Sequence, residues 1–363
     1  MLSLRILWIL IGAVFLLQSC KNTSEAPKAH LKIAVGQSVY ALPEPKRVNN
    51  EMQWFFADSI KTTQMIEEAI KEALAEFGNE KPQLLWIMGR AEDRVTIKKA
   101  IETYNTQGIP YIFDGSNWNE YTVIGPKGVT GQQEQSFIAV AIGGGADLQQ
   151  QFVKVPRLKD DYWALENLYG KEGAEKILAE ERVKYVSAAN DLAKKFDTGK
   201  AGTKIYFQMG NLHTPKQNWV LEGISKQFLN LPVIGGAQAD WAWQIHNGEV
   251  MENSLYGIMI TGDFDIAQSL GLRKKDSTLG PQSEVIIKNG LSGLKATPEY
   301  AVYFGCAGWN AEQNEQQQVI KSLLPDVITF GRFNGGEIGR IHNDSLNTSG
   351  IDLLSLLLIS NRD

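Results

Sequence analysis

Short apolar runs alternate with longer amphipathic stretches along this chain, and the order of the two recurs. The runs at 204–211 and 300–304 are rich in β-branched and aromatic residues, which favours strands. Each is followed by a stretch of helical composition, at 215–229 and 310–324. A second apolar run then ends in a pair of glycines. The order predicts strand, helix and strand, repeated.

A hairpin and a closing strand complete each repeat. Asn247-Gly248 is a typical hairpin turn, and the apolar run 254–263 follows it. Segments 340–344 and 350–360 take the same places in the last copy, and the triplet Ile-His-Asn occurs in both copies. A weaker first copy consists of 83–89, 95–105, 109–115 and 136–143. We therefore predict an α/β fold in which repeated β-α-β-β-β units form mixed sheets covered by helices.

Three further segments lie outside these repeats. Residues 62–77 predict the clearest helix, because their apolar positions recur on one face, and a short strand at 31–35 precedes it. Segment 160–199 is rich in glutamate and lysine, so we predict a solvated helical connector, with a partner-binding surface as the alternative. Residues 271–297 predict a loop-rich link.

Residues 1–20 have the pattern of an export signal, with one arginine before an apolar stretch. The stretch ends in Leu-Gln-Ser-Cys, which is similar to a bacterial lipobox, where the chain is cut before the cysteine and the thiol is lipidated. The alternative is an uncleaved anchor helix. We expect a lipoprotein of the bacterial cell envelope, lipidated at Cys20, with 21–30 as a flexible tether.

Composition narrows the class further. The 363 residues are 43% hydrophobic and 21% charged, which suits a globular protein with one or two cores. The net charge of −5 gives no electrostatic footprint for nucleic acid. A lipidated Cys20 leaves Cys306 without an intramolecular disulfide partner. The four histidines lack ligand spacing, so we predict no metal and no cofactor.

The strand ends carry the candidate ligand site. A turn built from small residues lets a ligand approach the backbone, because no Cβ intervenes. The candidate contact residues are Gly235, Gly236, Asp240, Cys306, Asn310, Gly335, Gly336 and Glu337. The tryptophans that follow the same turns are Trp118, Trp241, Trp243 and Trp309. Aromatic walls around a few polar groups are typical of small-ligand sites, although lids over sheet ends have the same composition.

Cys306 provides an enzymatic alternative. With His342 as base and Glu337 to orient it, the thiol would act as a nucleophile, favoured by its place before a predicted helix. A cysteine between two small residues at a strand end is more often a small packed residue. We therefore predict a non-catalytic protein. The alternatives are a Cys306-dependent enzyme and a structural or partner-binding envelope protein without a small ligand.

Two blocks of the sequence resemble the FIST domain, a sensory module of bacterial signal-transduction proteins. They are LPVIGGAQADW with HNGEV and SLYGIMITGD, within 231–263, and YFGCAGWN with FGRFNGGEIG, within 303–339. The resemblance implies a FIST N-terminal-like domain at 31–159. It also implies a C-terminal-like region at 200–363, with repeat units at 200–270 and 300–363.

The same resemblance implies what the protein does. A FIST domain binds a small molecule, with amino acids as the ligand class, and acts on a signalling protein partner rather than as a catalyst. The family has an arginine where this chain has Trp309. Because a guanidinium suits a carboxylate, this difference predicts a different ligand or none.

Overall fold

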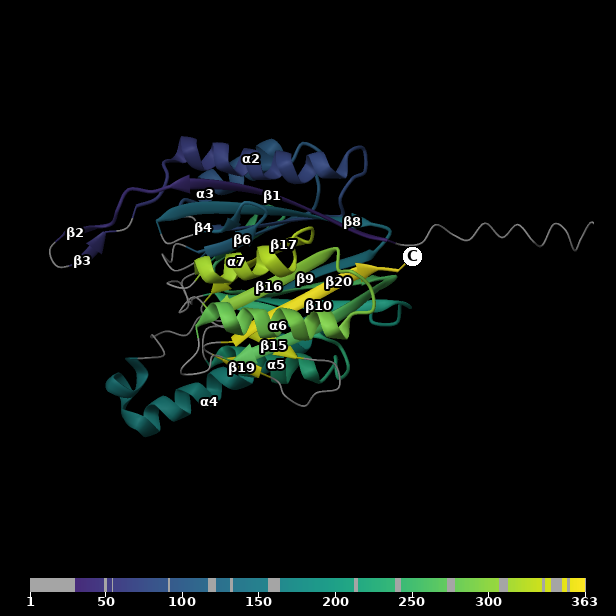
Figure 1. The fold of residues 1–363 in the computed structure, drawn as a ribbon. Coiled ribbons are helices and arrows are strands. Elements are labelled where there is room, and N and C mark those ends of the chain that lie inside the picture. Colours follow the sequence, from purple (N-terminus) through teal and green to yellow (C-terminus); the bar gives the residue numbers. More distant parts are fainter. Residues whose placement is uncertain are drawn as a thin grey trace, which may run out of the picture.

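The structure, a computed structural model, describes residues 30–48, 51–53, 55–90, 92–116, 122–130, 133–155, 164–211, 215–238, 243–272, 278–306, 313–334, 337–340, 348–350 and 353–362. Within these ranges the chain forms three six-stranded mixed sheets whose outer faces are covered by helices (Figure 1). A two-stranded ladder, β2 (Lys46–Val48) with β3 (Glu51–Gln53), projects from this body. The predicted α/β fold is confirmed.

Each third of the described chain folds into the same unit. The first consists of β1 (Leu31–Ala41), α2 (Ser59–Phe77), β4 (Leu84–Arg90), α3 (Arg94–Tyr104), β5 (Tyr111–Ser116), β6 (Thr122–Gly125), β7 (Gly128–Val129) and β8 (Glu134–Gly144). The second consists of β9 (Asp147–Lys154), α4 (Leu165–Ala193), β10 (Thr203–Asn211), α5 (Lys216–Ser225), β11 (Val233–Gln238), β12 (Trp243–His246), β13 (Glu249–Met251) and β14 (Ser254–Gly262). The third consists of β15 (Phe264–Leu272), α6 (Leu279–Gly293), β16 (Tyr300–Cys306), α7 (Gln313–Leu323), β17 (Ile328–Asn334), β18 (Glu337–Arg340), β19 (Thr348–Gly350) and β20 (Leu353–Asn361). The predicted β-α-β-β-β repeat is therefore the later part of a longer unit that opens with one more strand and helix.

The hairpin of each unit leaves its own sheet. The strand orders are β1-β8-β4-β5-β12-β13, β9-β14-β10-β11-β18-β19 and β15-β20-β16-β17-β6-β7. The second unit thus completes the sheet of the first, the third completes that of the second, and the first completes that of the third. Among the described strands, each six-stranded sheet contains four strands of one unit and two of another.

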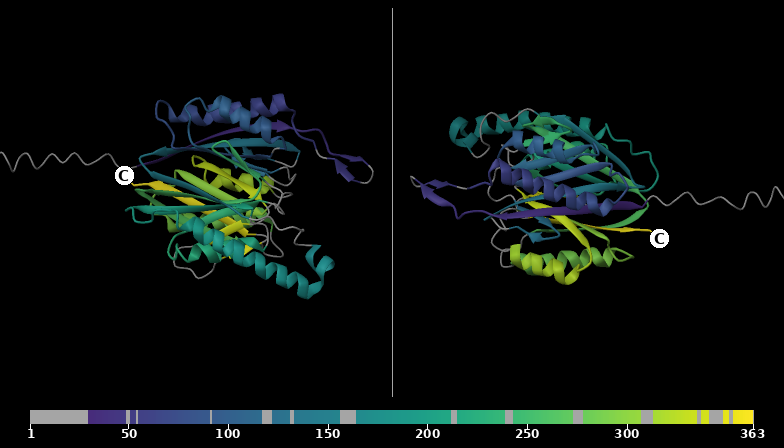
Figure 2. Two further views of the ribbon diagram at one scale, coloured as in Figure 1. Left: turned by 180° about the vertical axis from the view of Figure 1, so that it is seen from behind. Right: turned by 90° about the horizontal axis from the view of Figure 1, so that it is seen from above.

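Strand direction gives the molecule two distinct ends. In each unit the two central strands are parallel, as in β4 and β5, while the closing strand is antiparallel to them. We call the end where these parallel strands finish the rim, and the opposite end the base. Leu31 begins β1 at the base, where its N–H donates to the Asn361 side chain at 2.8 Å. Both chain ends of the described part therefore lie at the base, while the β2–β3 ladder projects at the rim (Figure 2).

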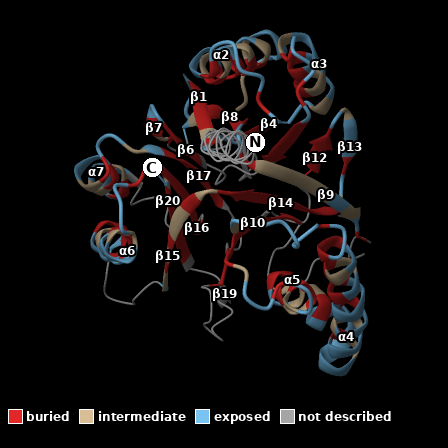
Figure 3. Ribbon diagram, turned by 90° about the vertical axis from the view of Figure 1, so that its right-hand side faces the viewer, coloured by how far each residue is buried: buried red, intermediate tan, exposed pale blue. Residues whose placement is uncertain are grey.

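The central strands of the three six-stranded sheets are buried on both faces. The inner faces enclose one central cluster, in which the Trp86 ring lies 5.7 Å from Phe207, 6.4 Å from Phe304 and 6.5 Å from Phe330. The outer faces are covered by the helix pairs α2 with α3, α4 with α5, and α6 with α7 (Figure 3). Strands buried on two faces have continuous apolar runs, which is the pattern that made β4, β10 and β16 recognisable in the sequence.

The expected loop-rich link at 271–297 is wrong. Residues Leu279–Gly293 form α6, which buries Ile286 and Ile287 against its sheet. Gly290 of this helix has a packing role. A Cβ on Gly290 would lie 3.1 Å from Leu358, so the helix lies close to the strands because this side chain is absent.

The predicted connector is helical, as expected, but it is not solvated along its whole length. In α4, Tyr185, Ala189 and Leu192 are buried against α5 and the second sheet. Their spacing of three to four residues places them on one helix face. The glutamates and lysines that precede this stripe along α4 hid it in the sequence.

The two Ile-His-Asn triplets are not structural counterparts. Asn247 and Gly248 form the predicted turn, with φ of 48° and 90° as a type I′ hairpin requires. Ile245 of the first triplet pairs with Phe113 of β5. The counterpart of Phe113 in the second sheet is Gly235 of β11, and Gly235 pairs with Ile338. Ile338 is therefore the counterpart of Ile245. The second triplet, 341–343, follows that position and lies outside the described residues.

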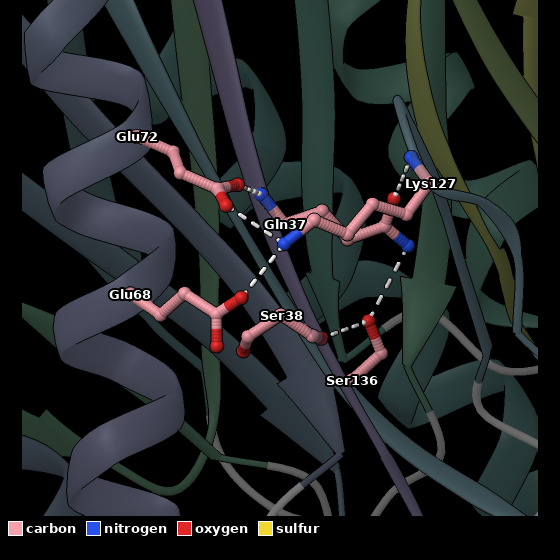
Figure 4. A network of polar contacts seen from close by, with 6 residues as sticks. All are labelled: Gln37, Ser38, Glu68, Glu72, Lys127 and Ser136. Carbon is pink, nitrogen blue, oxygen red and sulfur yellow. Dashed lines mark hydrogen bonds and ion pairs between the residues drawn. The ribbon is translucent and has the colours of Figure 1, made fainter.

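The β6–β7 hairpin of the first unit, which belongs to the sheet of the third unit, is held to β1 by a polar network (Figure 4). The fully buried Gln37 side chain donates to the carbonyl of Gly128 at 3.1 Å and accepts from the N–H of Lys127 at 2.7 Å. The Lys127 ammonium is 2.7 Å from carboxylate oxygens of Glu68 and Glu72 on α2. These contacts join β1, α2 and the β6–β7 hairpin, so Gln37 has a structural role.

In the second unit, the corresponding contact between its β12–β13 hairpin and its first strand, β9, is aromatic. The His246 ring stacks on Phe152 of β9 with centroids 4.9 Å apart and meets Tyr256 of β14 edge-on at 5.1 Å. Burial lowers the pKa of His246 to about 4, although the carboxylate of Glu249 across the hairpin opposes this shift. The imidazole is therefore neutral at ordinary pH.

We expect this neutral His246 to make stability depend on pH. Its folded pKa of about 4 lies below the ordinary value of 6.5, so the unfolded chain takes up this proton first. The stabilisation is complete above pH 6.5 and is lost as pH falls towards 4. Between about pH 7.5 and about pH 5 the loss is about 2 kcal/mol. Urea unfolding at both pH values should show a weaker pH dependence, by this amount, in His246→Phe than in wild type. Equal pH dependence in the two proteins would contradict the assignment.

Candidate functional site

The rim gathers the carboxyl ends of the parallel strands from all three units. These ends are Arg90, Ser116, Asn211, Gln238, Cys306 and Asn334. In sheets with parallel strands, ligands bind outside such ends, where loops and helix starts meet. The predicted strand-end site therefore belongs to a part of the fold that suits a ligand.

The structure brings together predicted contact residues from two units. Gly236 of β11 pairs with Glu337 of β18, and Gly235 pairs with Ile338. Cys306 ends the neighbouring parallel pair, opposite Asn334. The remaining candidates lie outside the described residues: Asp240, Asn310, Gly335, Gly336, Trp118, Trp241, Trp309 and His342.

Gly235 is explained by contact between strands. A Cβ at this position would lie 1.8 Å from the carbonyl oxygen of Gln208. The equivalent residue of the third unit, Gly331, would bring a Cβ within 1.7 Å of the Tyr303 oxygen. These glycines let neighbouring strands approach, so ligand access is not needed to account for them.

Cys306 and Trp243 are packed residues. The cysteine is 6% exposed and lies in the apolar cluster of the third unit with Tyr303, Phe333 and Leu354. Trp243 is 2% exposed, and its ring lies 5.1 Å from that of Phe113. This favours packing over catalysis for the thiol, and a core role for this tryptophan.

A buried ion pair that the sequence interpretation missed lies beneath the rim. Asp114 of β5 and Arg332 of β17 face inward at equivalent positions of the first and third units, and the equivalent position of the second unit is Gly236. Both charged side chains are fully buried. A signal was present, because each is the one charged residue within an apolar strand run, YIFDGS and ITFGRFN.

This ion pair joins all three units. Nη1 of Arg332 donates to Oδ2 of Asp114, and the Tyr256 hydroxyl of β14 donates to the same oxygen. Nη2 of Arg332 donates to the carbonyl of Gly236 at 3.2 Å. The backbone of Gly236, which the sequence placed in the ligand site, is therefore held from below by a cation of another unit.

Electrostatics assign this group a positioning role. Burial raises the pKa of Asp114, and the Arg332 guanidinium and the Tyr256 hydroxyl oppose that shift. A buried ion pair adds little net stability, but its geometry is specific, and loss of one partner leaves a costly buried charge. The pair can fix the relative positions of strand ends from three units.

Two further observations bear on the site. No three His, Cys, Asp or Glu side chains in the described ranges come together as metal ligands. Across the same ranges, no helix is long and apolar enough to cross a membrane. Cys20 lies outside them.

Comparisons with known proteins do not identify a family. No protein-family model matches the sequence, and no curated protein does either. Among solved structures, a cyanuric acid hydrolase from A. caulinodans aligns with 91% of this chain and 99% of its own, at 8% identity and a TM-score of 0.40. Phosphoribosylformylglycinamidine synthase II from Thermotoga maritima covers 91% of this chain and 72% of its own, at 9% identity and a TM-score of 0.24. PurLQS from the same organism covers 93% and 73%, at 9% identity and a TM-score of 0.23. Likenesses of this size do not bear on what the chain does.

We expect the Asp114–Arg332 pair to behave as one unit in mutagenesis. Arg332→Met leaves the Asp114 carboxylate buried without its guanidinium, which should cost about 3–5 kcal/mol of unfolding free energy. Asp114→Leu should cost a similar amount. The double variant removes both charges, so its loss should be well below the sum. Urea unfolding of the three variants measures this. Tyr256→Phe removes one hydrogen bond to Asp114 but no charge, and should lose about 1.5–3 kcal/mol. Additive losses would mean that the two charges act independently.

Proposed function

We propose that this chain is a membrane-tethered, non-catalytic lipoprotein that binds a small molecule at its rim and acts as a sensory protein of FIST type. One observation carries this proposal. The two blocks of sequence that resemble the family are far apart in the chain, yet β11 of the first block pairs with β18 of the second. Gly236 and Glu337, both candidate contacts, are neighbours in that ladder. A shared ligand site would require this arrangement.

The buried Asp114–Arg332 pair, which lies beneath these residues, supports the proposal of a ligand site. Arg332 holds the Gly236 carbonyl and is itself held by Asp114 from a third strand. A site whose backbone is fixed in advance loses less conformational entropy when a ligand binds. Two of the candidate contact residues, Asp240 and Glu337, are acidic and suit the ammonium group of an amino acid, while Trp309 in place of the family's arginine changes what the carboxylate would meet.

The position of residue 30, the first described residue, agrees with a tether at the base. Residue 30 precedes β1 at the base, beside the end of β20, and the rim lies at the opposite end of the strands (Figures 1 and 2). An anchor at Cys20 would hold the base towards the membrane and leave the rim open to solvent. The packed state of Cys306 favours binding over thiol chemistry.

We expect a ligand to be found by thermal unfolding of the full chain in a mild detergent, with common amino acids and other small metabolites. A ligand at about a hundred times its dissociation constant stabilises the folded state by about 2.7 kcal/mol. Glu337→Gln should abolish that shift. Glu76→Gln, the same change on the exposed side of α2, should leave it intact.

The same screen separates the alternatives. Cys306→Ala should retain the ligand-induced shift, and the ligand should be recovered unchanged from wild type. A compound consumed by wild type but not by Cys306→Ala would establish the enzyme instead. A screen without any shift would favour the envelope protein that binds only a partner.

We expect the tether to depend on one thiol. In bacteria given labelled palmitate, wild type and Cys306→Ala should carry the label and sediment with membranes. Cys20→Ser should lose the label. Label retained in Cys20→Ser would contradict the lipobox, and an unlabelled wild type that still sediments with membranes would indicate an uncleaved anchor helix.

A further inference from the structure

A pocket of about 310 Å³ opens at the rim of the first unit, between the starts of α2 and α3. Its walls include Phe55, Phe56, Asp58, Glu92 and Asp93. Its volume falls in the range of small-molecule sites, and it lies where the carboxyl end of β4 leads into α3. None of the candidate residues predicted from the sequence belongs to it.

The charge of this pocket favours a cation. Three carboxylates line it, and among the described residues no lysine or arginine belongs to its lining. Asp58 accepts from the N–H of Lys61 at 2.7 Å, and Asp93 accepts from the N–H groups of Val95 and Thr96 at 3.0 and 3.1 Å. Hydrogen bonds from Thr96 hold the pKa of Asp93 below its ordinary value, so this carboxylate is ionised at neutral pH.

The same hydrogen bonds disfavour an anion. A free helix N-terminus attracts phosphate or carboxylate through its unpaired N–H groups. Here the side chains of Asp58 and Asp93 cap both helices and occupy those groups. An incoming carboxylate would meet three negative charges, while a cation would find the carboxylates of Asp58 and Asp93 already oriented. Glu92 caps neither helix and is therefore free of this structural role.

The aromatic walls already accept cations from the protein. The Arg90 guanidinium lies 4.8 Å from the centre of the Phe56 ring, and the Lys46 ammonium lies 6.0 Å from that of Phe55. Arg90 is 2% exposed, and burial lowers its pKa to about 10, so it is a permanent charge behind the wall. Lys46 is exposed on β2, so a ligand can displace it from the Phe55 face.

We propose that this pocket binds an organic ammonium group, with its charge among Asp58, Glu92 and Asp93 and its alkyl substituents against Phe55 and Phe56. Aromatic faces prefer alkylated ammonium ions, because these give up little hydration when they contact a ring. This second site is independent of the ligand proposed for Gly236 and Glu337.

Choline and its neutral isostere 3,3-dimethylbutan-1-ol test the charge requirement directly. Isothermal titration of the full chain in a mild detergent should show choline binding that weakens as salt is raised. The alcohol should bind at least about tenfold more weakly, because it has the same shape without the charge. Acetate should give no binding heat. Equal affinity for choline and the alcohol, or no heat with choline, would overturn the proposal.

Matched variants locate the site. Glu92→Gln should raise the dissociation constant of choline about threefold or more, since one carboxylate is lost. Lys46→Met should lower it, because the competing ammonium is removed from the Phe55 face. Glu76→Gln changes net charge equally at an exposed site on α2 and should leave affinity within about twofold. Equal effects of Glu92→Gln and Glu76→Gln, or loss of choline binding in Glu337→Gln, would refute this location.

Discussion

The cyclic exchange of hairpins is the constraint on which the rest of the structure depends. Each four-stranded sheet receives its last two strands from another unit, so the ring closes only when all three units are present. Hairpin strands cover edges that would otherwise expose unpaired backbone groups. The pairing of Ile124 with Gly331 joins residues that are 207 positions apart in sequence. Such long-range contacts make folding slow and tie the fate of each unit to the others.

The same exchange explains how one buried ion pair can serve three units. Repetition brings Asp114, Gly236 and Arg332 to equivalent inward positions near the common centre of the sheets. Three identical residues would fail there, because three like charges repel and three glycines leave a void. Divergence gives one anion, one cation and one backbone carbonyl, which satisfy each other. The repeat places the three residues at equivalent positions, and the differences between the units allow these residues to pair with one another.

Sequence patterns revealed the elements but not the destinations of the strands. Local order predicted β10, α5, β11 and the Asn247-Gly248 turn, because propensity and turn chemistry act over a few residues. No local signal states that β12 pairs with β5 of another unit. Helix α6 was missed because its glycines allow close packing against the strands. The Asp114–Arg332 pair was missed because no local sequence pattern shows which residues of different units pair with each other. Of the eight predicted contact residues, Gly235, Gly236, Cys306 and Glu337 fall within described strands, and packing alone accounts for Gly235 and Cys306.

The three units therefore present one scaffold with three different chemistries at the rim. The first begins its second helix beside an acidic, aromatic pocket. The second begins α5 with Lys216, which is 2% exposed and has its ammonium 5.5 Å from the centre of the Tyr185 ring. In the third unit, Glu337 of β18 pairs with Gly236 of β11, which belongs to the second unit. Because the ion pair and the exchanged hairpins fix the strands rigidly, the starts of helices and the strand ends can change without loss of the fold. The three units can therefore differ at the rim while the shared core holds their strand ends in place.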